Sequence, residues 1–137
     1  MTKKEIELTK WLDKARKDVI TFQIMGQEVF TLDIALFHAQ QAVEKWLKTL
    51  VLLNGLIVVK THDIKELLIS LETFYPDIIS ETTENYAEVL NNYAVSGRYP
   101  DEDTTEEDYQ NDLIIGTEAL AFFETFTQSK VNPEIWR

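Results

Sequence analysis

Residues 32–53 read LDIALFHAQQAVEKWLKTLVLL, and this stretch decides the fold of the 137-residue chain. Seven of its apolar residues are spaced four and three apart without interruption, which places them on one side of an α-helix. The stripe consists of Leu32, Leu36, Ala39, Val43, Trp46, Leu50 and Leu53. Thr31 is a candidate N-cap, and Asn54-Gly55 is a strong stop signal. The stretch therefore predicts one helix of about six turns.

The segments on either side of this helix carry the same periodicity. Residues 4–25 hold an apolar stripe, and Gly26 suits the C-terminal cap of a helix there. The stripe consists of Leu8, Trp11, Leu12, Ala15, Val19 and Phe22. Further helices are expected over residues 63–76, 79–94 and 105–129. Asp63 and Thr105 are the expected N-caps of the first and last of these, each with an acidic residue three positions later. Residues 56–60 are rich in β-branched side chains, but a single short strand has no partner, so we expect an extended loop. The sequence predicts an all-α protein, an antiparallel up-and-down four-helix bundle with one additional helix, about five helices in all.

The composition indicates one compact domain. A hydrophobic content of 45% and a charged content of 27% are ordinary for a folded globular protein. We expect a single helical domain over residues 1–129 and a short tail over residues 130–137. Because the chain has no cysteine, disulfide frameworks, thiolate nucleophiles and cysteine-based zinc sites are excluded. No apolar run is long enough for a signal peptide or a transmembrane helix, so we expect a cytoplasmic protein without membrane contact.

Charge is divided unevenly between the two halves of the chain. The formal net charge is -11, yet residues 1–65 contain ten Lys and Arg against eight Asp and Glu, whereas residues 66–137 contain three against sixteen. An anionic ligand is therefore expected on the first half, and a cationic protein partner on the second. The acidic total argues against a domain that clamps nucleic acid through phosphate neutralisation alone.

A polar stripe also follows the helix of residues 32–53. Its four residues are spaced three, four and three apart, so they share one side of the helix beside the apolar seam. They are His38, Gln41, Lys45 and Lys48. An imidazole, an amide and two ammonium groups in line offer hydrogen-bond donors to phosphate and base-edge groups. The alternative is a solvated face on which Glu44 and Lys48 form an i,i+4 pair.

Three further residues are candidates for the same nucleotide or phosphate ligand. His62 stands at the start of the helix expected over residues 63–76, where the alternative role is a hydrogen bond to nearby backbone. Arg98 is an isolated basic residue in an acidic region. Its planar guanidinium suits a phosphate, and the alternative is a weak surface ion pair with the acidic residues that follow it. Tyr99, like nearby Tyr93, is suited either to stack on a base or to fill the end of the core.

The helix of residues 32–53 has more apolar surface than one core-facing stripe requires. Ile34, Ala35, Ala42 and Leu52 lie outside the stripe, and surplus apolar surface on a bundle helix favours a homodimer.

The motifs of most catalytic and cofactor sites are missing. The four glycines are isolated, which excludes a glycine-rich phosphate loop, and neither histidine has the helical spacing of a metal-binding pair. We expect no metal, no cofactor and no catalytic residue.

Three motifs, taken in order, resemble the HEPN domain (higher eukaryotes and prokaryotes nucleotide-binding). They are FHAQQAVEKWLK at residues 37–48, Thr61-His62-Asp63-Ile64, and Arg98-Tyr99-Pro100-Asp101. The resemblance implies an antiparallel helical bundle, usually a homodimer, often encoded beside a small nucleotidyltransferase. The polar positions that match the family motifs are His38, Gln41, Lys45, His62, Arg98 and Tyr99.

Many HEPN proteins are ribonucleases that carry an Arg followed a few residues later by a His. Here the corresponding positions after Arg98 are Asp103, Thr104 and Thr105. The resemblance therefore implies the other group, non-catalytic domains that bind nucleotides and act with a separately encoded nucleotidyltransferase. Two alternatives remain open: a ribonuclease or toxin that uses His38 or His62 with Arg98, and a purely structural interaction module.

Overall fold

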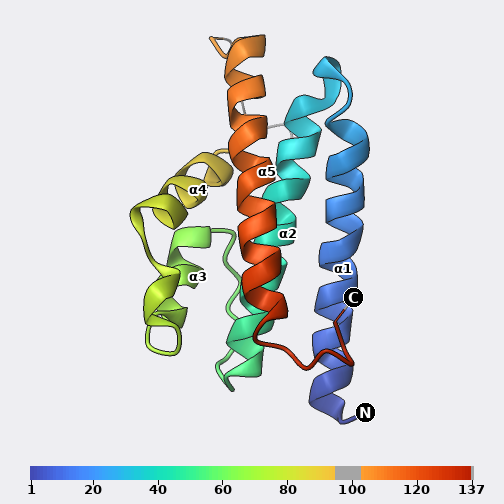
Figure 1. Ribbon diagram of the computed structural model, residues 1–137, viewed down its shortest axis with the longest axis vertical. Helices are drawn as coiled ribbons and strands as arrows, with labels where there is room; N and C mark the ends of the chain where they lie inside the picture. Colours follow the sequence, from blue (N-terminus) through green and yellow to red (C-terminus); the bar gives the residue numbers. More distant parts are fainter. Residues whose placement is uncertain (95–102, 137) are drawn as a thin grey trace.

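The computed structural model describes residues 1–94 and 103–136, and its regular elements are all helical. The five α-helices are α1 (Lys3–Met25), α2 (Leu32–Leu53), α3 (Ile64–Leu71), α4 (Glu81–Asn91) and α5 (Glu106–Gln128), with short 3-10 turns η1 (Val29–Thr31) and η2 (Pro76–Ile78). Helices α1 and α2 are antiparallel, α3 and α4 carry the chain back beside α2, and α5 runs opposite to α1 (Figure 1). The prediction of an all-α bundle of about five helices is confirmed.

Side-chain caps fix most helix starts where the sequence predicts them. Thr105 accepts a hydrogen bond from the Asp108 backbone N–H, and the Asp108 side chain accepts one from the Thr105 N–H, which is a complete capping box. Asp63 caps α3 by accepting from two backbone N–H groups. Thr31 does precede α2 as predicted, but its hydroxyl makes no capping hydrogen bond there, so its predicted role as a side-chain cap is wrong. The hydroxyl instead donates to the Met25 carbonyl at 2.6 Å and closes the turn between α1 and α2.

Helix α2 ends where the Asn54-Gly55 pair predicts. Gly55 has a φ of 75°, in the left-handed region that glycine enters without a Cβ penalty. The Asn54 side chain donates to the Leu50 carbonyl at 2.8 Å and covers one of the last carbonyls of the helix. Residues 56–63 then run as a loop before α3, which agrees with the extended loop expected there.

Helices α3 and α4 are shorter than the sequence predicts. Helix α3 ends at Leu71 and not near Pro76, because the Leu71 carbonyl accepts from the N–H groups of Phe74 and Tyr75 in a closing turn. Pro76 instead begins a 3-10 turn, as expected for a residue with a fixed φ at a first helical position. Helix α4 begins only after Ser80, whose hydroxyl caps it.

Helix α2 is the centre of the bundle and contacts each of the other four helices. Ala35 and Ala42, two residues of its apparent apolar surplus, are fully buried inside this single chain, and Leu52 packs near the C-terminal segment. Of the four, only Ile34 is substantially exposed, at 38%. The apolar surplus of α2 is therefore used within the chain, and it gives no support to a homodimer.

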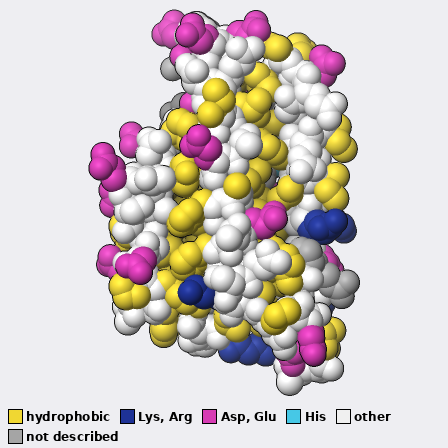
Figure 2. Space-filling view, in the orientation of Figure 1, with side chains coloured by type: hydrophobic (Ala, Val, Ile, Leu, Met, Phe, Trp, Pro, Cys, Tyr) yellow, Lys and Arg dark blue, Asp and Glu magenta, His cyan; other side chains and the backbone are white. Residues whose placement is uncertain are grey.

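Helix α5 packs closely against α2 at Gly116. A Cβ placed on this glycine would lie 3.1 Å from the Leu36 side chain and 3.8 Å from the Ala39 Cβ. The missing side chain therefore allows the two helices to approach each other. Figure 2 shows the face over α5, where apolar and acidic side chains dominate and few cations are visible.

The segment after α5 packs back on the first helix. Val131 and Ile135 are buried together with Leu8 of α1, and Figure 1 shows this segment crossing to α1. The residues expected to form a short tail therefore contribute a small second apolar cluster. None of the described helices combines the length and the apolar content that a bilayer crossing requires.

Candidate functional site

The polar stripe of α2 lies on the side of the helix that faces away from α5. Leu36 and Ala39 face α5 at Gly116, and His38 is about 200° around the helix from Leu36. The structure brings five of the predicted residues to this side, namely His38, Gln41, Lys45, Lys48 and His62. Arg98 and Tyr99 lie outside the described residues.

Two of these side chains are held by Asp18, a buried carboxylate of α1. Nδ1 of His38 lies 2.8 Å from Asp18 Oδ1, and the Lys45 ammonium pairs with Asp18 Oδ2. Since an ionised carboxylate only accepts, His38 donates from Nδ1 and keeps Nε2 for other partners. A carboxylate removed from water needs such donors. We call Asp18, His38 and Lys45 the Asp18 cluster.

A second carboxylate, Glu44 of α2, holds the other two basic residues. Its Oε1 atom lies 3.1 Å from Lys48 Nζ and 2.8 Å from His62 Nδ1. The side chains of Glu44 and Lys48 are 3% and 9% exposed, whereas that of His62 is 65% exposed. The predicted Glu44–Lys48 pair is therefore present, but it is buried, and the alternative of a solvated face is wrong for these two residues. We call Glu44, Lys48 and His62 the Glu44 cluster.

Two glutamines complete the Glu44 cluster. Gln40 is fully buried, and its Nε2 donates to the His62 carbonyl at 2.8 Å. Gln41 in turn donates from Nε2 to Gln40 Oε1 at 2.7 Å. His62 is thus fixed through both its backbone and its ring. Asp63, and not His62, caps α3, so the alternative role of His62 at that helix start is not observed.

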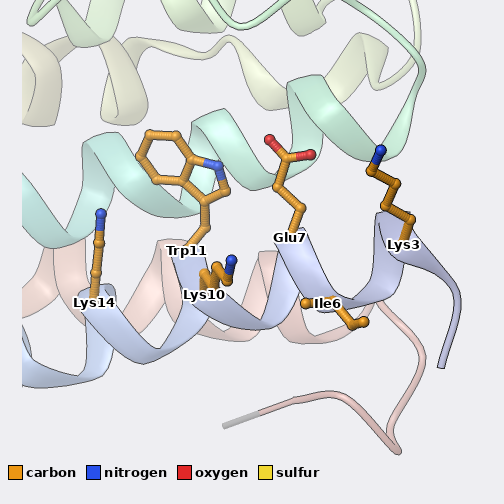
Figure 3. Close-up of a pocket in the computed structure, with 6 residues that line it drawn as sticks. All are labelled: Lys3, Ile6, Glu7, Lys10, Trp11 and Lys14. Atoms are coloured by element: carbon orange, nitrogen blue, oxygen red, sulfur yellow. The ribbon is translucent and has the colours of Figure 1, made fainter.

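An indole ring from α1 joins the two helices beside the Glu44 cluster. The centre of the Trp11 ring lies 5.9 Å from Lys48 Nζ and 5.8 Å from Lys14 Nζ, distances at which a cation is attracted to the ring. Trp11 also lines a groove of about 360 Å³ along α1, which is shown in Figure 3. The groove residues are Lys3, Ile6, Glu7, Lys10, Trp11 and Lys14.

The positive charge that remains available lies on α1 and not on α2. In each cluster one carboxylate offsets one lysine. Helix α1 carries six Lys and Arg against four Asp and Glu, whereas α5 carries six acidic residues and no Lys or Arg. An anion that approaches the described part of the chain is therefore attracted to the side formed by α1 and α2.

Tyr93 belongs to the core and not to a ligand site. The residue is 3% exposed, and its hydroxyl donates to Asp112 Oδ2 at 2.7 Å. Burial, followed by the hydrogen bond and the charge of Asp112, raises the pKa of Tyr93 well above its ordinary value. Within residues 1–94 and 103–136, no three His, Asp or Glu side chains gather closely enough to hold a metal ion.

Asp18 and Gln40 were not predicted from the sequence to belong to a site, and Trp11 was predicted to belong to the apolar stripe of its helix. Asp18 is a carboxylate within the apolar stripe of α1, between Ala15 and Phe22. A charged residue on the buried side of a helix requires a partner, so this position could have indicated the cluster. Trp11 gave no such indication, because an aromatic residue in an apolar stripe is usually a core residue.

Comparisons with curated proteins and with solved structures find no match. A family model, described as the HEPN domain, matches residues 8–124. The matched range includes both carboxylate clusters and most of α1, together with α2, α3 and α4. This range is well over half of the chain, and the protein therefore belongs to the HEPN domain family.

Proposed function

We propose that this HEPN protein is a non-catalytic module that binds a nucleotide or another phosphorylated small molecule on the side formed by α1 and α2. The observation that carries the proposal is the gathering of His38, Lys45, Lys48 and His62 around two buried carboxylates. Both imidazoles use Nδ1 for the carboxylate and keep Nε2 for a ligand. Donors that are already fixed in place lose little freedom when they bind an anion.

Isothermal titration with ATP, GTP and UTP tests this proposal. We expect heat of binding with at least one nucleotide, and a weaker affinity in Lys45→Ala. Lys60→Ala is the matched control, because Lys60 is an exposed lysine of the loop before α3. Circular dichroism checks that each variant is folded. If no nucleotide gives heat at millimolar concentration, the ligand assignment is wrong. If a nucleotide binds but Lys45→Ala binds it as tightly as the wild type, the ligand does not depend on the α2 lysines.

We further propose that the protein acts with a separately encoded nucleotidyltransferase and forms a homodimer, as the HEPN resemblance implies. The acidic surface of α4 and α5 suits a cationic protein partner. Purification from the native host with partner identification, together with light scattering for the molar mass, tests both statements. A monomer that co-purifies with no nucleotidyltransferase would contradict them.

One observation favours a second function, cleavage of RNA. His62 combines an exposed ring with a buried carboxylate at Nδ1, which is an arrangement suited to proton transfer at Nε2. Expression in a bacterium distinguishes this function from simple binding. Growth arrest that is relieved by Arg98→Ala or His62→Gln supports the ribonuclease, whereas intact RNA and normal growth support the binding module.

A further inference from the structure

We propose that the groove along α1 is the place where the nucleotide docks, with the base stacked on Trp11 and the phosphates held by Lys10 and Lys14. This inference rests on the proposed function and assigns its binding site. It moves the main phosphate contacts from the predicted α2 lysines to α1.

The positive charge of the groove is available to a ligand, whereas the lysines of α2 are already bound. Lys48 is almost fully buried and bound to Glu44, and Lys45 is bound to Asp18. The three groove lysines are exposed, whereas Asp18 and Glu44 hold the two lysines of α2. The groove contains one opposing charge, Glu7, against three lysines. An incoming phosphate therefore finds exposed cations that need not leave Asp18 or Glu44.

The groove residues are spaced along one face of α1. Lys3, Glu7, Lys10 and Lys14 follow one another at intervals of four, three and four residues, so their side chains leave α1 on the same side. In Figure 3 the side chains of Lys3, Glu7, Trp11 and Lys14 extend to the same side of the α1 ribbon, toward α2. The lysines span about 16 Å along the helix axis. Charge and aromatic surface are therefore combined in one elongated groove.

Trp11 is held on the side of the Glu44 cluster. The ring lies beside Lys48, which Glu44 fixes in turn, so the indole is connected to the Glu44 cluster and to His62. On the groove side, the neighbouring cation is Lys14, an exposed side chain that can move. A fixed aromatic surface beside mobile cations is the combination that stacks a base and binds its phosphates.

The ligand class that fits is a single nucleotide and not a long nucleic acid. Stacking on an aromatic ring is tolerant of base identity, so adenine, guanine and uracil nucleotides are all candidates. A polyanion longer than the groove would extend over a protein whose net charge is -11 and be repelled.

Titration of four ligands into the full chain tests the groove. The ligands are ATP, inorganic triphosphate, adenosine and a short single-stranded RNA, and the readouts are calorimetric affinity and tryptophan fluorescence. We expect ATP to bind most tightly and to quench the fluorescence, and we expect Trp11→Phe to lose the quenching. Trp46 and Trp136 remain in that variant and report any effect outside the groove.

Two variants then measure the groove contacts, and a third is their control. Trp11→Ala is expected to weaken ATP binding on the order of ten- to a hundred-fold while leaving triphosphate binding nearly unchanged. Lys14→Glu is expected to weaken both. Arg16→Glu is the matched control. This substitution changes the charge of α1 by the same amount, but Arg16 lines a different cavity, together with Trp46 and Trp136. Circular dichroism verifies that each variant keeps its helical content.

The outcomes separate this inference from the function on which it rests. If wild-type protein binds no nucleotide, the proposed function is wrong and the groove assignment with it. If ATP binds, but Trp11→Ala and Lys14→Glu bind as tightly as Arg16→Glu, the function stands and the groove is refuted. Tighter binding of the RNA than of ATP also refutes the assignment of a mononucleotide.

Discussion

Replacing Glu44 by glutamine removes the buried negative charge that Lys48 and His62 share. The side chain of Lys48 is only 9% exposed, so its ammonium group would stay in a place that water hardly reaches. Removing one partner of a buried ion pair typically costs about 3–5 kcal/mol, because the remaining charge is unpaired. The bond to His62 adds little, since that imidazole is largely exposed and can turn to water. We therefore expect Glu44→Gln to lower the free energy of unfolding by about 3 kcal/mol.

Urea denaturation followed by circular dichroism measures this loss. With a slope of about 2 kcal/mol per molar urea, a change of about 3 kcal/mol moves the midpoint down by about 1.5 M. The double variant Glu44→Met/Lys48→Met is the control, because it removes both charges and keeps similar side-chain volume. We expect it to be more stable than Glu44→Gln. The reasoning is refuted if Glu44→Gln stays within about 0.5 kcal/mol of the wild type, or if the double variant is the less stable of the two.

Three further predictions concern the packing of the bundle. Burial raises the pKa of Tyr93, so ionisation above about pH 10 favours the unfolded chain. The stability of the wild type should therefore fall more steeply from pH 10 to 11 than that of Tyr93→Phe, as measured by urea titrations at each pH. Gly116→Val forces a side chain against Leu36 and should cost about 1–3 kcal/mol, visible as a lower melting temperature. Ile135→Ala should cost about 2 kcal/mol in urea unfolding, because this residue is buried against α1, and an unchanged midpoint would show that the C-terminal segment does not pack there.

The sequence predicted α2 better than any other element, for a physical reason. Its apolar pattern repeats over the whole helix, and Asn54-Gly55 supplies a local stop, so the length and the C-terminal end of α2 depend on neighbouring residues. The ends of α3 and α4 were predicted less well. Pro76 marks a break in the sequence, but the closing turn at Leu71 and the cap at Ser80 decide where the helices end.

The candidate site was predicted only as far as one helix determines it. Helical spacing placed His38 and Lys45 on one side of α2, and the structure agrees. Their partner Asp18 lies on another helix, and its arrival beside them depends on how α1 packs along α2, which no local pattern states. The contact of His62 with Glu44 depends on the path of the loop before α3, and a local sequence pattern does not predict that path. The roles of Arg98 and Tyr99 stay predictions.

The sharing of Asp18 by two residues of α2 has a consequence for how α1 and α2 align. Apolar stripes are nearly periodic along a helix. Shifting one helix along the other by one turn, about 5.4 Å, therefore replaces each apolar contact with a similar one. The carboxylate of Asp18 has no such substitute: the same slip would separate it from His38 and Lys45 together. One acidic side chain therefore favours a single register of α1 along α2, although the apolar contacts alone would permit several.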